Sequence, residues 1–254
     1  TSINELLRAV AILAAITVIL APAVLALAGL LRARRAPRVP VPPFPWRWCF
    51  ASALAFVLAF NLQFFLQELF LVLPKALTPG LEPTLFHNNH AWTGDEPVAE
   101  LFQGTGALAT LIAGAICAML LDRTRGGVAR LLLLWLAYWG VIMALAQVVI
   151  GAINPQADVG RAMVYLQLPD SLRLLAAALA LLLMPAFALW LLRRIPAPGH
   201  AAGTPAGGRH VFALATLPAL IALPLIVLYR VPREFAEVVI VPALFIIAGI
   251  PWMQ

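Results

Sequence analysis

Seven apolar runs, each close to the length of a membrane-spanning helix, constrain this chain more than any other feature of its sequence. A helix rises about 1.5 Å per residue, so about 20 apolar residues cross a hydrocarbon core about 30 Å thick. The sequence therefore predicts a single all-α domain over residues 1–254, a polytopic transmembrane helix bundle of about seven spans. The runs are Ala9–Leu31, Cys49–Leu73, Leu101–Leu121, Leu131–Ile153, Leu172–Leu192, Val211–Tyr229 and Val238–Trp252.

Composition supports a membrane protein and excludes a nucleic-acid-binding protein. Hydrophobic residues make up 63% of the chain and charged residues 11%, whereas soluble domains carry about 25% charged residues. The net charge is +6, but the basic residues lie in short clusters between the apolar runs, as membrane anchors do. We therefore expect the lipid bilayer and other membrane proteins as partners. The two cysteines, Cys49 and Cys117, form no recognisable motif.

Basic residues predict how the spans are oriented. The connections after the first, third and fifth spans hold eleven arginines and one acid, Asp122, whereas the N-terminus and the other connections hold six basic and nine acidic residues. By the positive-inside rule the first set is cytoplasmic. The N-terminus is then outside, the C-terminus inside, and the polar loop at residues 74–100 extracytoplasmic. A bacterial inner membrane or a plasma membrane is the expected location.

Three segments between or before the spans have their own predicted character. The first run exceeds the roughly 7–15 apolar residues of a signal peptide and precedes an arginine cluster, so we expect it to remain as a span. Residues 36–47 are rich in proline and are predicted to form a cytoplasmic polyproline linker. The connection Ile195–Gly208, rich in Pro, Gly and Ala, is predicted to be a flexible coil.

The loop at residues 74–100 carries the densest polar chemistry. His87 and His90 are three residues apart, so a turn or a helical start would direct both imidazoles to the same side. Glu68 precedes this loop and Asp158 follows a later span, and both are predicted on the extracytoplasmic side. We expect both carboxylates and at least one histidine to converge at the outer membrane boundary, because an unpaired buried carboxylate is costly.

The third apolar run carries a packing pattern of small residues. Gly106, Thr110 and Gly114 recur at every fourth position, which places them on one face of a helix. Small residues at this spacing allow two helix backbones to approach closely in a membrane. We therefore expect this run to be a buried central helix that packs through these three residues.

Two segments resemble known sequence motifs of an enzyme family. Gln67-Glu68-Leu69-Phe70-Leu71 resembles the HExxH helix of the site-2-protease-like intramembrane metallopeptidases, and Asn154-Pro155-Gln156-Ala157-Asp158-Val159-Gly160 is similar to that family's Asn-Pro…Asp-Gly element. With the glycine-rich start of the third span, the resemblance covers about residues 61–160. It implies a general base at Glu68 and a zinc ligand at Asp158. Both motif histidines are replaced, by Gln67 and Leu71.

Three functions are compatible with these residues. The first, which the replaced histidines favour, is a non-catalytic relative of the metallopeptidases, a scaffold or accessory subunit of a membrane complex without a cofactor. The second is a metal-dependent intramembrane hydrolase in which His87, His90 and Asp158 rebuild a zinc site around Glu68, since catalytic zinc uses three such ligands and an open position. In the third, these side chains form a proton or cation path.

Overall fold

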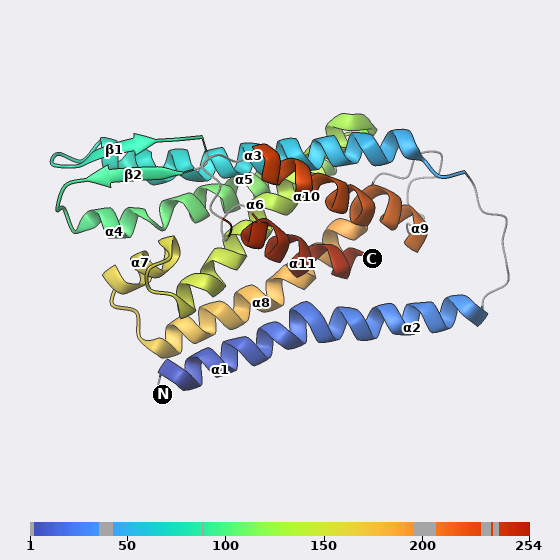
Figure 1. Ribbon diagram of the computed structural model, residues 1–254, viewed down its shortest axis with the longest axis horizontal. Helices are drawn as coiled ribbons and strands as arrows, with labels where there is room; N and C mark the ends of the chain where they lie inside the picture. Colours follow the sequence, from blue (N-terminus) through green and yellow to red (C-terminus); the bar gives the residue numbers. More distant parts are fainter. Residues whose placement is uncertain (1–2, 36–42, 88, 196–206, 230–234, 236–238) are drawn as a thin grey trace.

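The computed structural model describes residues 3–35, 43–87, 89–195, 207–229, 235 and 239–254. Long helices run side by side, and a small hairpin lies at one end of the bundle (Figure 1). The elements are α1 (Ile3–Ala14), η1 (Ala15–Leu20), α2 (Ala21–Arg35), α3 (Trp46–Ala76), β1 (Glu82–Leu85), β2 (His90–Thr93), α4 (Val98–Phe102), α5 (Thr105–Leu121), α6 (Gly127–Ile153), α7 (Asp158–Tyr165), α8 (Asp170–Leu192), α9 (Gly208–Val211), η2 (Phe212–Thr216), α10 (Leu217–Tyr229) and α11 (Val241–Met253).

Apolar helices of membrane-spanning length confirm that the chain is a helical integral membrane protein. Among the described residues, six such helices are long and apolar enough to cross a bilayer: Leu7–Gly29, Trp46–Ala76, Val98–Leu121, Gly127–Ile153, Asp170–Leu192 and Gly208–Tyr229. The seventh predicted run coincides with α11, which has 13 residues. At 1.5 Å per residue, α11 is about 20 Å long, which is less than the thickness of the hydrocarbon core.

Helix α6 is the centre of the bundle and packs against α3, α5, α7 and α8. Its side chains Trp135, Tyr138 and Trp139 are fully buried. Phe56 of α3 meets Trp135 and Trp139 edge to face, with ring centroids 4.8 and 4.9 Å apart, a geometry that aromatic pairs prefer. The Tyr138 hydroxyl donates a hydrogen bond to the Phe245 carbonyl of α11 at 2.8 Å. Aromatic packing therefore holds the bundle together around α6.

Helix α5 packs through the predicted small residues. A Cβ added at Gly114 would lie 2.8 Å from the backbone nitrogen of Val141 in α6, and one added at Gly106 would lie 2.8 Å from Cγ of Leu71 in α3. Thr110 between them is fully buried, and its hydroxyl donates to the Ala107 carbonyl at 3.0 Å. These residues therefore lie where α5 approaches two neighbouring helices.

The position of α5 in the bundle differs from the expectation of a buried central helix. Its outer face is exposed, with Leu108 at 55% and Met119 at 65% of full exposure. Helix α6 occupies the centre instead. The small-residue pattern identifies one packed face, and a helix with a single packed face lies at the edge of a bundle.

The loop at residues 74–100 contains a hairpin, which the prediction of an all-α fold missed. Strand β1 pairs antiparallel with β2, with Leu85 opposite His90 and Pro83 opposite Trp92. Each strand has four residues, too few for a clear alternating pattern, and proline lowers strand propensity further. The hairpin lies beside the C-terminal part of α3, and its turn points back along α3 (Figure 1).

The two predicted cytoplasmic connections lie largely outside the described residues. Of the predicted linker 36–47, residues 36–42 fall outside, and α3 already begins at Trp46. Of the predicted coil Ile195–Gly208, residues 196–206 fall outside, and α9 begins at Gly208.

Candidate functional site

Three polar side chains of α3 face the interior of the bundle. Gln63, Gln67 and Glu68 are all buried. Gln63 and Gln67 are four residues apart and share one face of the helix. Gln63 Nε2 donates to the Leu136 carbonyl of α6 at 2.9 Å. Gln147 Nε2, also on α6, donates to Gln67 Oε1 at 2.6 Å. Gln63 and Gln67 therefore each share a hydrogen bond with α6, although Gln63 Oε1 has no partner among the described residues.

Glu68 forms a buried pair with His90 of the hairpin. The distance from His90 Nδ1 to Glu68 Oε2 is 2.7 Å, and the two side chains are 8% and 5% exposed. His90 Nε2 lies 3.2 Å from Gln103 Oε1. Both ring nitrogens of His90 therefore have a hydrogen-bond partner from another element of the fold. We call this contact the Glu68–His90 pair.

The hairpin reaches this pair by folding back along α3. Glu68 lies eight residues before Ala76, the last residue of α3, so it is about 12 Å from that helix end. The strand alternation turns His90 and Trp92 toward the helices, whereas Ala91 and Thr93 are exposed. The Trp92 ring stacks on His90 with an interplanar angle of 8° and a centroid distance of 5.8 Å.

Two cations also hold the hairpin at Trp92. Lys75 Nζ lies 4.5 Å from the ring centroid and Arg161 Cζ lies 5.7 Å from it, both within the range of cation–π attraction. Lys75 is fully buried and donates to the Leu71 carbonyl at 2.8 Å. Arg161 also pairs with Glu100 at 3.2 Å. The hairpin is thus fixed to α3 and α7 by aromatic and charged contacts.

A cavity of about 380 Å³ lies beside the Glu68–His90 pair, and we call it the polar cavity. Helix α6 ends at Ile153 and α7 begins at Asp158. Pro155 lies in the gap between them, as expected because proline interrupts a helix. The turn between them brings Asp158 to the cavity. The lining residues are Phe64, Gln67, Glu68, Asn89, His90, Gln147, Ile150, Asn154, Gln156, Ala157, Asp158, Val159, Val241 and Phe245.

Asp158 is the lining residue with the most perturbed acidity. Burial raises the pKa of its carboxyl from 3.8 to about 6, and the negative charge of Glu68 contributes to the rise. His90, followed by Lys75 and Arg161, opposes the rise of this pKa. Among the described residues, none donates a hydrogen bond to the Asp158 carboxylate. This carboxylate therefore borders the cavity without a hydrogen-bonded partner.

The structure brings three of the predicted site residues to one place. Glu68, His90 and Asp158 all line the polar cavity. His87 lies in the turn of the hairpin and is exposed. The expectation that both imidazoles point the same way is therefore wrong, because the chain reverses direction between them. Within the described part of the chain, no three His, Cys, Asp or Glu side chains are grouped as metal ligands.

Three residues of the site were not predicted. Gln103 follows α4 and bonds to His90, and Lys75 and Trp92 form the cation–π contact. The alternation of His90 and Trp92 in sequence was the one available signal, since residues two apart in a strand share a face. Lys75 and Gln103 join the site through contacts distant in sequence, and no local pattern marks them.

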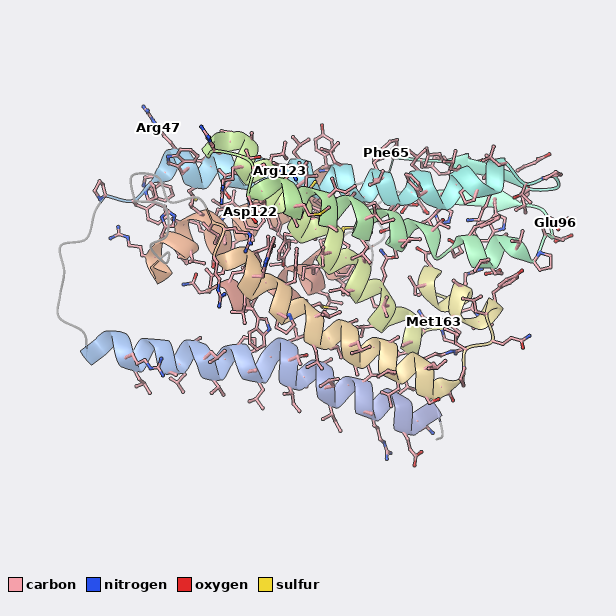
Figure 2. All side chains as sticks on the ribbon, turned by 180° about the vertical axis from the view of Figure 1, so that it is seen from behind. Arg47, Phe65, Glu96, Asp122, Arg123 and Met163 are labelled. Carbon is pink, nitrogen blue, oxygen red and sulfur yellow. The ribbon has the colours of Figure 1, made fainter. Side chains whose placement is uncertain are left out.

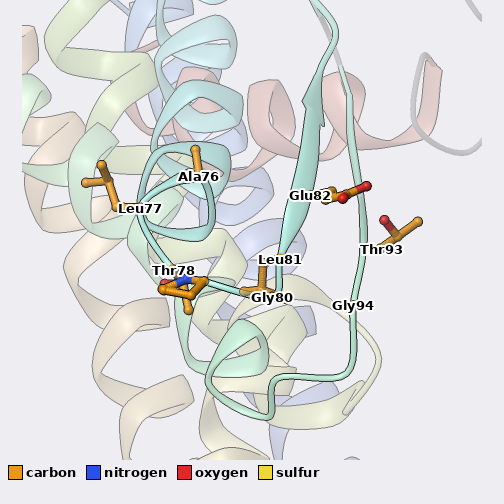
Figure 3. A pocket seen from close by; sticks show the side chains of 9 residues that line it. Ala76, Leu77, Thr78, Gly80, Leu81, Glu82, Thr93 and Gly94 are labelled. Atoms are coloured by element: carbon orange, nitrogen blue, oxygen red, sulfur yellow. The ribbon is translucent and has the colours of Figure 1, made fainter.

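Two further pockets lie near the hairpin. One of about 670 Å³ lies at its foot, between the end of α3 and the strands (Figure 3). Glu82 is the one ionisable residue in its lining, which runs from Ala76 to Glu82 and includes Thr93 and Gly94. The other, of about 360 Å³, shares Gln156 with the polar cavity. The polar cavity has the richest chemistry of the three.

Comparison with protein-family models, with curated proteins and with solved structures gives no match to this chain. The polar cavity and the Glu68–His90 pair are therefore the features from which a function is inferred.

Proposed function

We propose that this chain is a non-catalytic integral membrane protein, a scaffold or accessory subunit of a membrane complex, related to the site-2-protease-like intramembrane metallopeptidases. The Glu68–His90 pair carries the proposal. In the motif that Gln67–Leu71 resembles, the glutamate is the general base. Here Glu68 Oε2 lies 2.7 Å from His90 Nδ1, and Oε1 lies 3.5 Å from Gln67 Nε2. With both oxygens engaged, Glu68 is placed to bind the hairpin and not to activate water.

The replaced ligands support the same proposal. A catalytic zinc ion takes three protein ligands, and the positions of the two motif histidines hold Gln67 and Leu71. Gln67 accepts a hydrogen bond from Gln147, and Leu71 is fully buried. Both side chains thus serve packing between helices. At these two positions the chain has no side chain that would hold a catalytic zinc ion.

Zinc content tests the proposal. We expect the protein, purified from cells grown with added zinc, to hold no stoichiometric zinc by atomic emission. Glu68→Gln should keep the elution volume of the native protein and should likewise hold no zinc, because an amide still accepts a hydrogen bond from His90. One zinc per chain in the native protein would overturn the proposal.

A metal-dependent hydrolase is the second candidate, and one observation favours it. Glu68, His90 and Asp158 line the same cavity, and imidazole and carboxylate are zinc ligands. In that case His90→Ala should abolish bound zinc. Glu68→Gln should keep the zinc and lose only the hydrolytic activity. These outcomes differ from those of the first proposal in the native protein and in Glu68→Gln, which would both hold zinc.

We also propose that the N-terminus is extracytoplasmic, that the C-terminus is cytoplasmic, and that α11 belongs to a seventh span. Charge supports this orientation. Arg47 and Arg123 lie toward one end of the bundle, and Glu96 lies at the opposite end (Figure 2). At the arginine-rich end, Arg194 Nε lies 3.1 Å from Asp122 Oδ1, so that acid is neutralised locally. Positive charge marks the cytoplasmic end of a bundle.

Cysteine labelling tests the orientation. In a chain lacking Cys49 and Cys117, we expect Arg125→Cys to react with an impermeant thiol reagent after the membrane is permeabilised and not in intact cells. Glu96→Cys, in the exposed segment before α4, should react in intact cells and serves as the control. Labelling of Arg125→Cys in intact cells would reverse the proposed orientation.

A further inference from the structure

The polar cavity has one polar wall and one apolar wall. Glu68, Gln147 and Asp158 contribute carboxylate and amide groups, whereas Phe64, Ile150, Val241 and Phe245 contribute aromatic and aliphatic surface. A volume of about 380 Å³ falls in the range of about 300–1,000 Å³ that small-molecule sites occupy. Such walls fit a ligand with a polar head and an apolar chain.

Two acceptors at the polar wall have no donor among the described residues. The Asp158 carboxylate receives no hydrogen bond. Gln147 Oε1 is buried and has no partner, although its Nε2 donates to Gln67. Gln147 Oε1 has almost no exposed surface, so a ligand in the cavity would not reach it. The Asp158 carboxylate is half-buried and borders the cavity, so a ligand there that donates hydrogen bonds would supply the partner that this carboxylate lacks.

The cations around the cavity are already bonded elsewhere. His90 contacts Glu68 and Gln103. Lys75 donates to the Leu71 carbonyl, and Arg161 pairs with Glu100 and donates to the Gln156 carbonyl. The charge of Asp158 therefore has nearby cations but no hydrogen-bonded counter-ion. The raised pKa of Asp158 agrees with a carboxyl group that lacks such a partner.

We propose that the polar cavity binds a primary ammonium group carried on an apolar chain. The ammonium group has three N–H donors and no acceptor, which matches the Asp158 carboxylate as counter-ion and hydrogen-bond acceptor. The apolar chain lies along Phe64, Ile150 and Phe245. An aminophospholipid headgroup and a free amphiphilic amine share this chemistry. The inference goes beyond the proposed scaffold role and does not depend on it.

Binding of matched six-carbon probes tests the chemistry. The protein, treated with EDTA and reconstituted in nanodiscs of phosphatidylcholine, is titrated calorimetrically with hexylammonium, hexyltrimethylammonium, hexanol and hexanoate. We expect saturable binding of one hexylammonium per chain and at least ten-fold weaker binding of each other probe. Hexyltrimethylammonium keeps the charge and the chain but lacks N–H donors, so it separates hydrogen bonding from charge alone.

A variant tests whether the binding depends on Asp158. Asp158→Asn should weaken hexylammonium binding at least ten-fold, because it removes the counter-ion. Asp170→Asn is the matched control, because Asp170 lies in the first turn of α8 as Asp158 lies in the first turn of α7 and is not part of the cavity lining. It should bind like the native protein. Absence of hexylammonium binding to the native protein, or native affinity in folded Asp158→Asn, would overturn the inference.

A lipid comparison distinguishes the two sources of the ammonium group. If an aminophospholipid is the ligand, nanodiscs of phosphatidylethanolamine should weaken the apparent binding of hexylammonium at least ten-fold relative to phosphatidylcholine with the same acyl chains. If a free amine is the ligand, both lipids should give the same affinity. The zinc measurement tests the proposed function independently of this titration, because the titration uses protein from which metal has been removed.

Discussion

Gly114→Leu is expected to abolish most of the folded protein. A Cβ at this position would lie 2.8 Å from the Val141 nitrogen and 3.0 Å from the Gly140 Cα, both backbone atoms of α6. Backbone atoms cannot rotate aside, so α5 and α6 would have to separate along their contact. Overpacking costs about 1–3 kcal/mol where side chains can shift, and we expect the upper end of this range or more. The yield of monodisperse protein and its thermal unfolding temperature measure the effect.

The same substitution at two other glycines provides a comparison for the stability of Gly114→Leu. Gly106→Leu should also lower the unfolding temperature, because a Cβ there would lie 2.8 Å from Leu71 Cγ, 2.9 Å from Gln67 Cγ and 3.0 Å from the Gln67 carbonyl oxygen of α3. Gly29→Leu is the matched control, since Gly29 of α2 is exposed and has no atom within 4 Å of an added Cβ. It should fold like the native protein. Equal unfolding temperatures for Gly114→Leu and Gly29→Leu would contradict the proposed helix contact.

His90→Ala is expected to destabilise the protein by about 1–3 kcal/mol, the usual cost of leaving a buried polar group without its hydrogen-bond partner. Glu68 would then be left 5% exposed without its partner in the hairpin. The hairpin would also lose its link to the C-terminal part of α3. We therefore expect faster amide hydrogen exchange over residues 82–93 together with a lower unfolding temperature.

His87→Ala provides the matched control for that change. The same substitution at an exposed position in the turn should alter stability by less than about 0.5 kcal/mol. The double variant Glu68→Leu/His90→Leu should recover much of the loss, because replacing a buried pair by apolar groups is often neutral. If the amide hydrogens of residues 82–93 exchange at the same rate in His90→Ala and in His87→Ala, the Glu68–His90 pair does not hold the hairpin against α3.

The sequence by itself determined the class of the protein and several of its local features. Apolar runs of membrane-spanning length predict helices because a bilayer requires the backbone to satisfy its own hydrogen bonds. The spacing of Gly106 and Gly114 identifies a packed face because helix geometry fixes which residues share it. Pro155 predicts the break between α6 and α7 for the same local reason.

Tertiary structure alone decided how the site is assembled. Glu68, His90 and Asp158 come from α3, β2 and α7, and their contact depends on how these elements pack. His87 and His90 look equivalent in sequence, but pairing of β1 with β2 exposes the first and buries most of the second. Strands of four residues carry too little pattern to reveal that pairing. The choice of His90 is thus set by cross-strand hydrogen bonds and by the buried charge of Glu68, which are properties of the folded chain.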